Sequence, residues 1–132
     1  MNIEFIRAHC LALPHATEHV QWGDDLVFKI AGKMFAGAPL SPARIALSFK
    51  CTPEEFDELV ERPGVIPAPY MARAYWVALE RHDALSPVEI KVRLTRSYQL
   101  VFAKLPKKTQ AELARTKPLR PTRAVRSRAK KS

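Results

Sequence analysis

The first segment of the chain has the apolar spacing of an amphipathic helix. Asn2 precedes it as a good N-cap residue, and Pro14 interrupts it. Between them the apolar positions recur every three or four residues, at Ile3, Ile6, Cys10 and Leu13. Because this spacing gathers the side chains on one face, we expect the helix to lie against a sheet.

From Val20 onward the pattern becomes that of β-strands. Residues 26–30 form a β-prone run, Ala31-Gly32 suits a tight turn, and residues 33–38 form a second run. Together these segments predict a β-hairpin.

Three further segments are interpreted as strands. Residues 65–69 contain two prolines and must be extended or turning, and residues 75–79 predict another strand. Residues 44–50 alternate strictly, with Ile45, Leu47 and Phe49 on one face and Ala46, Ser48 and Lys50 on the other.

Two capping boxes predict helix starts, at Thr52-Pro53-Glu54-Glu55 and at Ser86-Pro87-Val88-Glu89. The first helix carries Phe56, Leu59 and Val60 on one side. The second has an apolar stripe that ends at Pro106 and consists of Ile90, Leu94, Tyr98, Val101 and Leu105.

The predicted order of elements is therefore α-β-β-β-α-β-β-α. This order predicts an α+β fold, a two-layer α/β sandwich in which helices pack on an antiparallel sheet. We place this domain at residues 1–108. Residues 109–132 are expected to form a basic, disordered C-terminal tail, with at most one further helical turn around Thr109 to Ala114.

The formal net charge of +9 is concentrated at the C-terminus. Residues 1–106 hold 12 Lys and Arg against 12 Asp and Glu, whereas residues 107–132 hold ten basic residues and only one acid, Glu112. Attraction to a polyanion must come mainly from this last segment, or from a local patch within the neutral part.

Several classes of protein have no support in the sequence. No apolar stretch approaches the roughly 20 residues that cross a bilayer, and the N-terminus lacks a secretory apolar core, so we expect a cytoplasmic protein. Cys10 and Cys51 belong to no paired motif and are expected to be reduced thiols in the core. Without a nucleophile elbow, P-loop or dinucleotide motif, we expect neither an enzyme nor a cofactor.

One metal motif occurs. His15-Ala16-Thr17-Glu18-His19 matches the H-x-x-E-H pattern, in which one helical face offers two histidine ligands. The pattern needs a helix and a third ligand, whereas Pro14 has just ended a helix. We therefore interpret His15 and His19 as surface histidines, and expect no zinc.

A set of short motifs keeps a fixed order along residues 1–108. They are Leu13-Pro14, Gly23-Asp24, Phe28-Lys29, Gly32-Lys33-Met34-Phe35-Ala36, Lys50, Glu58-Leu59, Pro63-Gly64-Val65-Ile66-Pro67, Tyr75-Trp76, Ser97-Tyr98-Gln99-Leu100-Val101 and Leu105-Pro106-Lys107-Lys108. In this order and spacing the sequence resembles the MmcQ/YjbR family. The tail lies outside the resemblance.

The resemblance implies a frataxin-like or secretion-chaperone-like two-layer α/β fold, in agreement with the predicted order of elements. It places residues 15–19 in a loop leading into the sheet. It also implies DNA binding through a double-wing surface and no shared enzymatic activity. Residues 70–75 depart from the family, because they keep Arg73 but lack the histidines, the asparagine and the second base that the family more often carries there. A basic role of this loop therefore depends on Arg73.

The leading hypothesis is a non-enzymatic nucleic-acid-binding protein that contacts the phosphate backbone, with DNA as the expected partner. In the domain, Lys29, Lys33 and Lys50 are expected to share one exposed region of the sheet, because Lys29 and Lys33 flank the hairpin and Lys50 lies on the outward face of its strand. Of Tyr75 and Trp76, which point to opposite faces, at least one is expected in the core. The full set of candidate contacts is Lys29, Lys33, Lys50, Arg73, Lys107, Lys108, Arg115, Lys117, Arg120, Arg123, Arg126, Arg128, Lys130 and Lys131.

The alternative is a protein-interaction or dimerisation module, in which a secretion-chaperone-like sheet docks a peptide and the tail is incidental.

Overall fold

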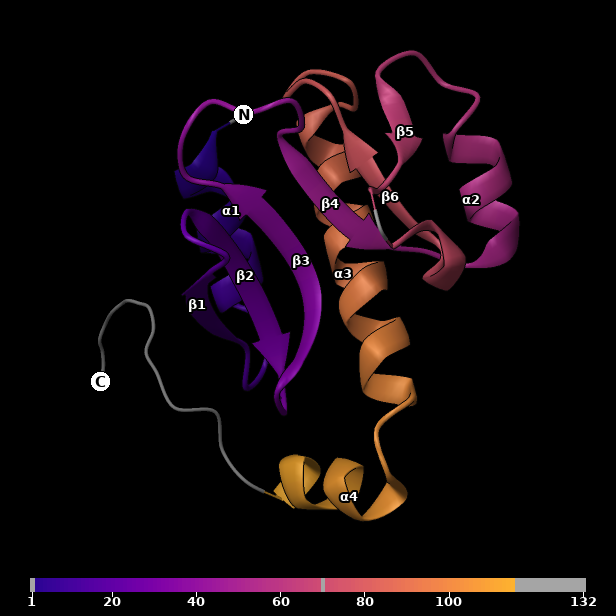
Figure 1. The fold of residues 1–132 in the computed structure, drawn as a ribbon. Helices are drawn as coiled ribbons and strands as arrows, with labels where there is room; N and C mark the ends of the chain where they lie inside the picture. The colour runs from indigo at the N-terminus through magenta and orange to yellow at the C-terminus, as the bar shows by residue number, and fades with distance from the viewer. Residues whose placement is uncertain (1, 70, 116–132) are drawn as a thin grey trace.

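The computed structural model describes residues 2–69 and 71–115 and consists of a six-stranded antiparallel sheet with helices on one face (Figure 1). The strands lie in the order β1-β2-β3-β4-β6-β5. They are β1 (Thr17–Gln21), β2 (Asp25–Ile30), β3 (Lys33–Pro39), β4 (Leu47–Lys50), β5 (Val65–Pro67) and β6 (Trp76–Leu79). The helices are α1 (Ile3–Leu11), α2 (Pro53–Leu59), α3 (Pro87–Ala103) and α4 (Lys107–Arg115), with a 3₁₀ turn, η1, at Ala72–Ala74.

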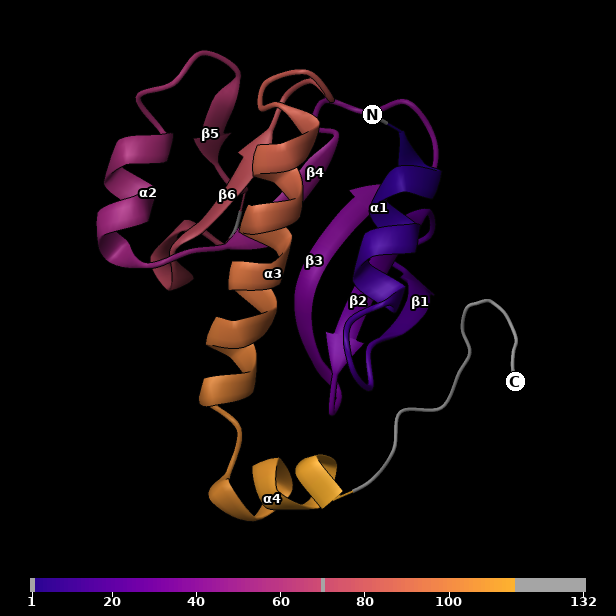
Figure 2. The ribbon, with the colours of Figure 1, turned by 180° about the vertical axis from the view of Figure 1, so that it is seen from behind.

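Seen from behind, α1 and α3 lie across the sheet (Figure 2). The predicted α+β two-layer sandwich is therefore confirmed. The face of the sheet opposite α1 and α3 is called the open face below. None of the described helices has the length and apolar character needed to span a membrane.

The first helix begins where the sequence predicts, and it is tied to the edge of the sheet. The Asn2 side chain accepts a hydrogen bond of 3.0 Å from the backbone N–H of Phe5. One turn on, the Arg7 guanidinium donates from Nε and Nη2 to the two carboxylate oxygens of Glu18 on β1, at 2.8 and 2.7 Å. This two-pronged ion pair fixes α1 over β1.

Strand β1 itself was not predicted. The sequence analysis assigned this stretch to a loop, yet Thr17 to Gln21 pair with Lys29 to Asp25 of β2 along the whole strand. Its residues are Thr, Glu, His, Val and Gln, and none of them is buried. Because neither face of this edge strand is buried, its sequence has no alternation of apolar and polar residues. The strand can be recognised only from its pairing with β2. The observed order gains one strand before α2 and a helix, α4, at the end.

The strand predicted at residues 44–50 is shorter, and one of its faces is reassigned. Pairing with β6 begins at Leu47, opposite Leu79. Ile45 precedes this ladder and packs with the second apolar cluster, which also contains Trp76, rather than with the main core that holds Leu47. Side chains alternate between the two faces only within a paired strand, and Ile45 precedes the pairing. The prediction that Ile45 shares a face with Leu47 is therefore wrong.

The two capping boxes differ in the structure. At α2 the Thr52 hydroxyl accepts from the N–H of Glu55, and the Glu55 carboxylate accepts from the N–H of Thr52. At α3 the Ser86 hydroxyl accepts from the N–H of Glu89 at 3.1 Å. The Glu89 carboxylate does not return to Ser86 but accepts from Arg62 at 2.6 Å. The second box therefore caps the helix in one direction only.

The main core lies between the sheet and α1, α2 and α3. Its largest fully buried side chains include Phe28, Phe35 and Phe49. Both cysteines are free and buried there, as predicted. Burial raises the pKa of Cys51 to about 11 and raises that of Cys10 further, so neither thiol has the depressed pKa of a reactive cysteine.

Helix α4 crosses the predicted domain boundary at residue 108. Leu113 packs against the main core, and the Gln110 amide donates to the carbonyl oxygens of Ala103 and Leu105 at 3.2 and 2.8 Å. The prediction that the tail begins at residue 109 is therefore wrong, because the folded part extends to Arg115. The rest of the predicted tail, residues 116–132, lies outside the described residues.

Candidate functional site

Lys29 and Lys50 share the open face, as expected. Lys29 lies between Phe28 and Ile30, which are both in the main core, so its own side chain points the other way. Lys50 follows the core residue Phe49 and lies on the same side for the same reason. In the ladder Lys29 is opposite Met34 of β3, and β3 separates the two lysine-bearing strands.

Lys50 has a neighbour that the sequence analysis missed. Its ammonium donates to the carbonyl oxygen of Ala74 at 2.6 Å, and η1, where Arg73 is exposed, contains this carbonyl. Burial lowers the pKa of Lys50, and the charge of nearby Lys104 lowers it further.

Lys33 does not share the open face. It lies opposite Ile30, whose side chain is in the main core, so alternation turns Lys33 toward the helix side at the end of the sheet. Lys107 and Lys108 open α4 and Arg115 closes it, all three exposed. The remaining candidates, Lys117, Arg120, Arg123, Arg126, Arg128, Lys130 and Lys131, lie outside the described residues.

Three separate segments bring positive charge to one end of the molecule. The β2–β3 turn, the last turn of α3 and helix α4 all lie at the lower end in Figure 1. We call their exposed basic residues the basic end: Lys33, Lys104, Lys107, Lys108 and Arg115. The ion pairs between described residues use Arg7, Arg62, Arg81, Arg93 and Arg96, and thus none of this group.

Negative charge gathers elsewhere. The stretch from Glu54 to Glu61, at α2, contains five acidic residues and no basic one. Figure 1 places α2 toward the other end of the molecule from α4. Residues 1–106 have no net formal charge, yet their acidic and basic side chains gather at different places on the molecule. The sequence analysis allowed for such a local patch but did not locate it.

A second feature of the open face was missed altogether. A cavity of about 500 Å³ opens on this face, and we call it the trough. Its lining is mainly apolar, with Trp22, Val27, Met34, Ile45 and Met71 among the contributors, and its polar groups include Asp25 and Ser48. Gly37 forms part of the floor, where a Cβ atom would be 3.5 Å from the Ser48 hydroxyl oxygen.

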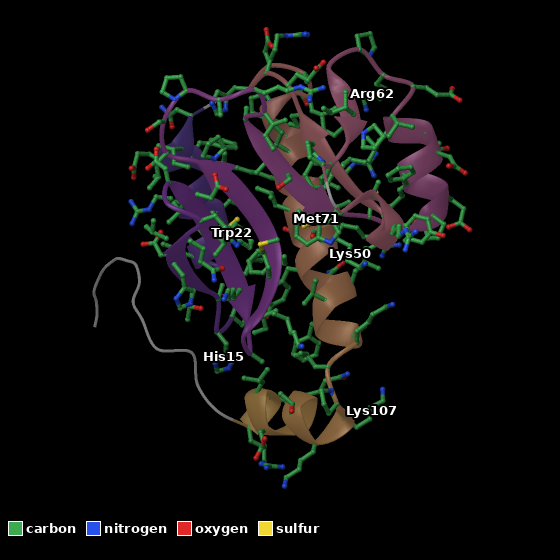
Figure 3. All side chains as sticks on the ribbon, viewed as in Figure 1. His15, Trp22, Lys50, Arg62, Met71 and Lys107 are labelled. Atoms are coloured by element: carbon green, nitrogen blue, oxygen red, sulfur yellow. The ribbon has the colours of Figure 1, made fainter. Side chains whose placement is uncertain are left out.

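The exposed aromatic residue of the trough is Trp22. In the view of Figure 3, Trp22 lies on the β1–β2 side of the sheet, and Met71 and Lys50 lie nearer β6. The Trp22 side chain is 70% exposed. Of the pair Tyr75 and Trp76, Trp76 is the buried member, at 6% exposed, whereas Tyr75 is 42% exposed. The sequence signal for Trp22 was a tryptophan beside glycine in a turn, with no apolar period around it.

The histidine motif does not form the helix that zinc hydrolysis needs. His15 lies in the turn before β1 and its Nε2 is 3.0 Å from the carbonyl oxygen of Leu113, while His19 lies within β1 and pairs with the Thr17 hydroxyl at 2.9 Å. Among the described residues, no group of three His, Cys, Asp or Glu side chains is arranged to hold a metal ion. Figure 3 places His15 beside α4.

The fold and these surfaces define an α+β sandwich with one helix-covered and one open sheet face. The sequence model of the YjbR family matches residues 11–100. The chain belongs to the YjbR family.

Two solved structures are similar to this chain. One is a Deinococcus radiodurans protein, DR2400, with a DUF419 domain; it has 27% sequence identity and a TM-score of 0.78, over 86% of this chain and 88% of that one. The other is a protein from Pseudomonas syringae with 23% identity and a TM-score of 0.63, over 76% of this chain and 98% of that one, and its likeness concerns the fold alone. No curated protein matches the sequence.

Proposed function

We propose that this protein is a non-enzymatic nucleic-acid-binding protein that holds the phosphate backbone at its basic end. The observation that carries the proposal is the convergence of Lys33, Lys104 and the α4 residues Lys107, Lys108 and Arg115 at one end of the molecule. Exposed lysines that converge from different segments attract a polyanion by releasing its counterions.

The sequence after α4 supports the same partner. Arg115 is followed by residues 116–132, which contain seven basic residues and no acidic one. The described basic end is thus continuous in sequence with a strongly basic segment. Phosphate contacts of this kind carry no base identity, so this surface is expected to bind with little sequence preference.

The test measures binding of the full chain to fluorescent duplex DNA, single-stranded DNA and RNA across a salt series. The triple variant K104Q/K107Q/K108Q removes three charges from the basic end. The matched control, R44Q/R81Q/K91Q, removes three charges that lie outside it.

The first variant is expected to flatten the slope of log K against log salt by about 2 to 3 on duplex DNA, since each lost contact contributes about 0.9. The control is expected to change the slope by much less. Equal losses in both variants would show a diffuse charge effect without a site. Absence of binding by the unaltered chain at low salt would exclude the proposal.

A protein-interaction surface is the second candidate, and one observation favours it. Val88 and Val92 lie one helical turn apart on α3 and are 73% and 59% exposed. An apolar pair on the outer side of a helix is a common feature of docking surfaces. If no nucleic acid binds, self-association of the unaltered chain and of V88S/V92S, measured by analytical ultracentrifugation, tests this function.

A further inference from the structure

The trough has opposite charges at its two ends. Asp25 lines one end, where β2 begins, and Lys29 stands four residues further along the same strand. That separation is roughly 13 Å along a strand. Lys50 lies on the same side, two residues after the lining residue Ser48. The trough therefore has a carboxylate in its lining at one end, and two lysines lie on the open face toward the other end.

Trp22 occupies this site at a conformational cost. Its φ of 51° is left-handed, a region that bulky side chains rarely adopt. Burial does not compensate for this cost, because the indole is mostly exposed. The tight β1–β2 turn requires left-handed residues, as the β2–β3 turn does at Ala31, whose φ is 50°, so the turn accounts for this backbone conformation and presents the indole to solvent.

We propose that the trough receives one unpaired base of a single-stranded nucleic acid, with the indole of Trp22 against the base and the adjacent phosphate at Lys29 and Lys50. This inference rests on the proposed function and adds a second contact to it. An apolar lining with two methionines adapts to a flat heterocycle, and an exposed tryptophan provides a stacking surface.

Charge sets the orientation of the strand. The Asp25 carboxylate repels phosphate but accepts hydrogen bonds from an exocyclic amino group of a base. Lys29 and Lys50 lie at the other end of the trough, and Lys104 of the basic end is close enough to Lys50 to lower its pKa. Lys29 is the residue before the last of β2, and the β2–β3 turn that follows is part of the basic end, so the proposed strand runs from the trough toward the basic end (Figure 1).

Pairing decides which nucleic acids fit. In a duplex both faces of each base are stacked and the amino groups are paired, so neither Trp22 nor Asp25 can engage them. The trough is therefore specific for single strands, whereas the basic end binds phosphates of either form.

The experiment compares 12-mers of dC and dT, a 12-bp duplex and the mononucleotide dCMP as ligands for the full chain. One variant is W22A. The other, G37V, fills the floor of the trough and leaves Trp22 in place; the first added atom meets only ordinary contacts of 3.5 Å and beyond. Q99A, an exposed change on α3 outside the proposed surfaces, is the control.

Both trough variants are expected to weaken binding of oligo-dC by roughly 5- to 150-fold while duplex affinity changes less than about twofold. Q99A is expected to bind like the unaltered chain. Oligo-dC is also expected to quench the Trp22 fluorescence of the unaltered chain, an effect that W22A abolishes. D25N is expected to reduce the preference for oligo-dC over oligo-dT.

Other outcomes separate the two proposals. If W22A and G37V bind both forms as the unaltered chain does, the base site is wrong and the basic end alone accounts for binding. If dCMP binds as tightly as oligo-dC, the ligand is a nucleotide and not a strand. If an apolar peptide quenches Trp22 and no oligonucleotide does, the trough belongs to a protein partner. If nothing binds at low salt, both proposals fail.

Discussion

The Ser97 hydroxyl on α3 donates a hydrogen bond of 2.6 Å to the carbonyl oxygen of Phe35 on β3. The Ser97 hydroxyl oxygen in turn accepts a hydrogen bond of 2.9 Å from the backbone N–H of Lys50 on β4. Ser97 is fully buried in the apolar stripe of α3. Its side chain thus bridges two strands where their ladder ends, just beyond the pair Ala36 and Phe49.

Replacing this serine should destabilise the fold. In Ser97→Ala the N–H of Lys50 and the carbonyl of Phe35 lose their partner, and an unsatisfied buried group costs about 1 to 3 kcal/mol. We expect the free energy of unfolding in urea to fall by about that amount. Gln99→Ala, an exposed change on the same helix, should stay within about 0.5 kcal/mol. A silent Ser97→Ala variant would mean that the bridge does not contribute to stability.

The Arg7–Glu18 pair predicts how stability depends on pH. Hydrogen bonds and charge from Arg7 lower the pKa of Glu18 in the folded state. Its stabilisation is therefore complete above the unfolded pKa of about 4.3 and is lost as the pH falls through the lower folded pKa. Glu18→Gln should cost about 1 kcal/mol at pH 7, since both side chains are partly exposed.

The difference between Glu18→Gln and the unaltered chain should then shrink in the acid range, in urea melts repeated between pH 7 and pH 3. Glu4→Gln is the control, because Glu4 contacts the same arginine from a much more exposed position. A difference that stays constant down to pH 3 would contradict the assignment.

Two truncations locate the end of the folded part. A chain ending at residue 108 loses Leu113 from the core and the carbonyl that faces His15. We expect it to lose about 1 to 2 kcal/mol, measured as a melting temperature several degrees lower. A chain ending at residue 115 keeps these contacts and should melt close to the full chain, since residues 116–132 lack apolar periodicity. Equal melting of both truncated chains would show that α4 adds nothing.

The cysteines give a test of global opening. Cys10 and Cys51 are buried and their pKa values are raised, so at pH 7.5 iodoacetamide should modify neither thiol in the native protein over the time in which it fully labels the urea-unfolded chain. Mass spectrometry of the intact protein reads this directly. Rapid labelling of Cys51 in buffer would indicate local opening beside η1.

Local chemistry alone specified much of this protein. The Asn2 and Thr52 caps, the Ala31-Gly32 turn and the apolar stripe from Ile90 to Leu105 could be identified because each depends on neighbours within a few residues. Burial of the two cysteines was predicted from the absence of a paired cysteine motif. The strand β1 escaped prediction because its stability comes from pairing with β2 and from Glu18 at Arg7, which are both distant in sequence.

Tertiary structure alone decided the surfaces. Helices α1 and α3 cover one face of the sheet, and this leaves Val27, Met34 and Ile45 to line the trough, although their apolarity in the sequence is indistinguishable from that of core residues. The basic end likewise needs the β2–β3 turn and α4 to lie at the same end of the molecule, although many residues separate them in the chain (Figure 1). Spacing along a sequence fixes the face of an element, whereas what covers that face depends on elements far away along the chain.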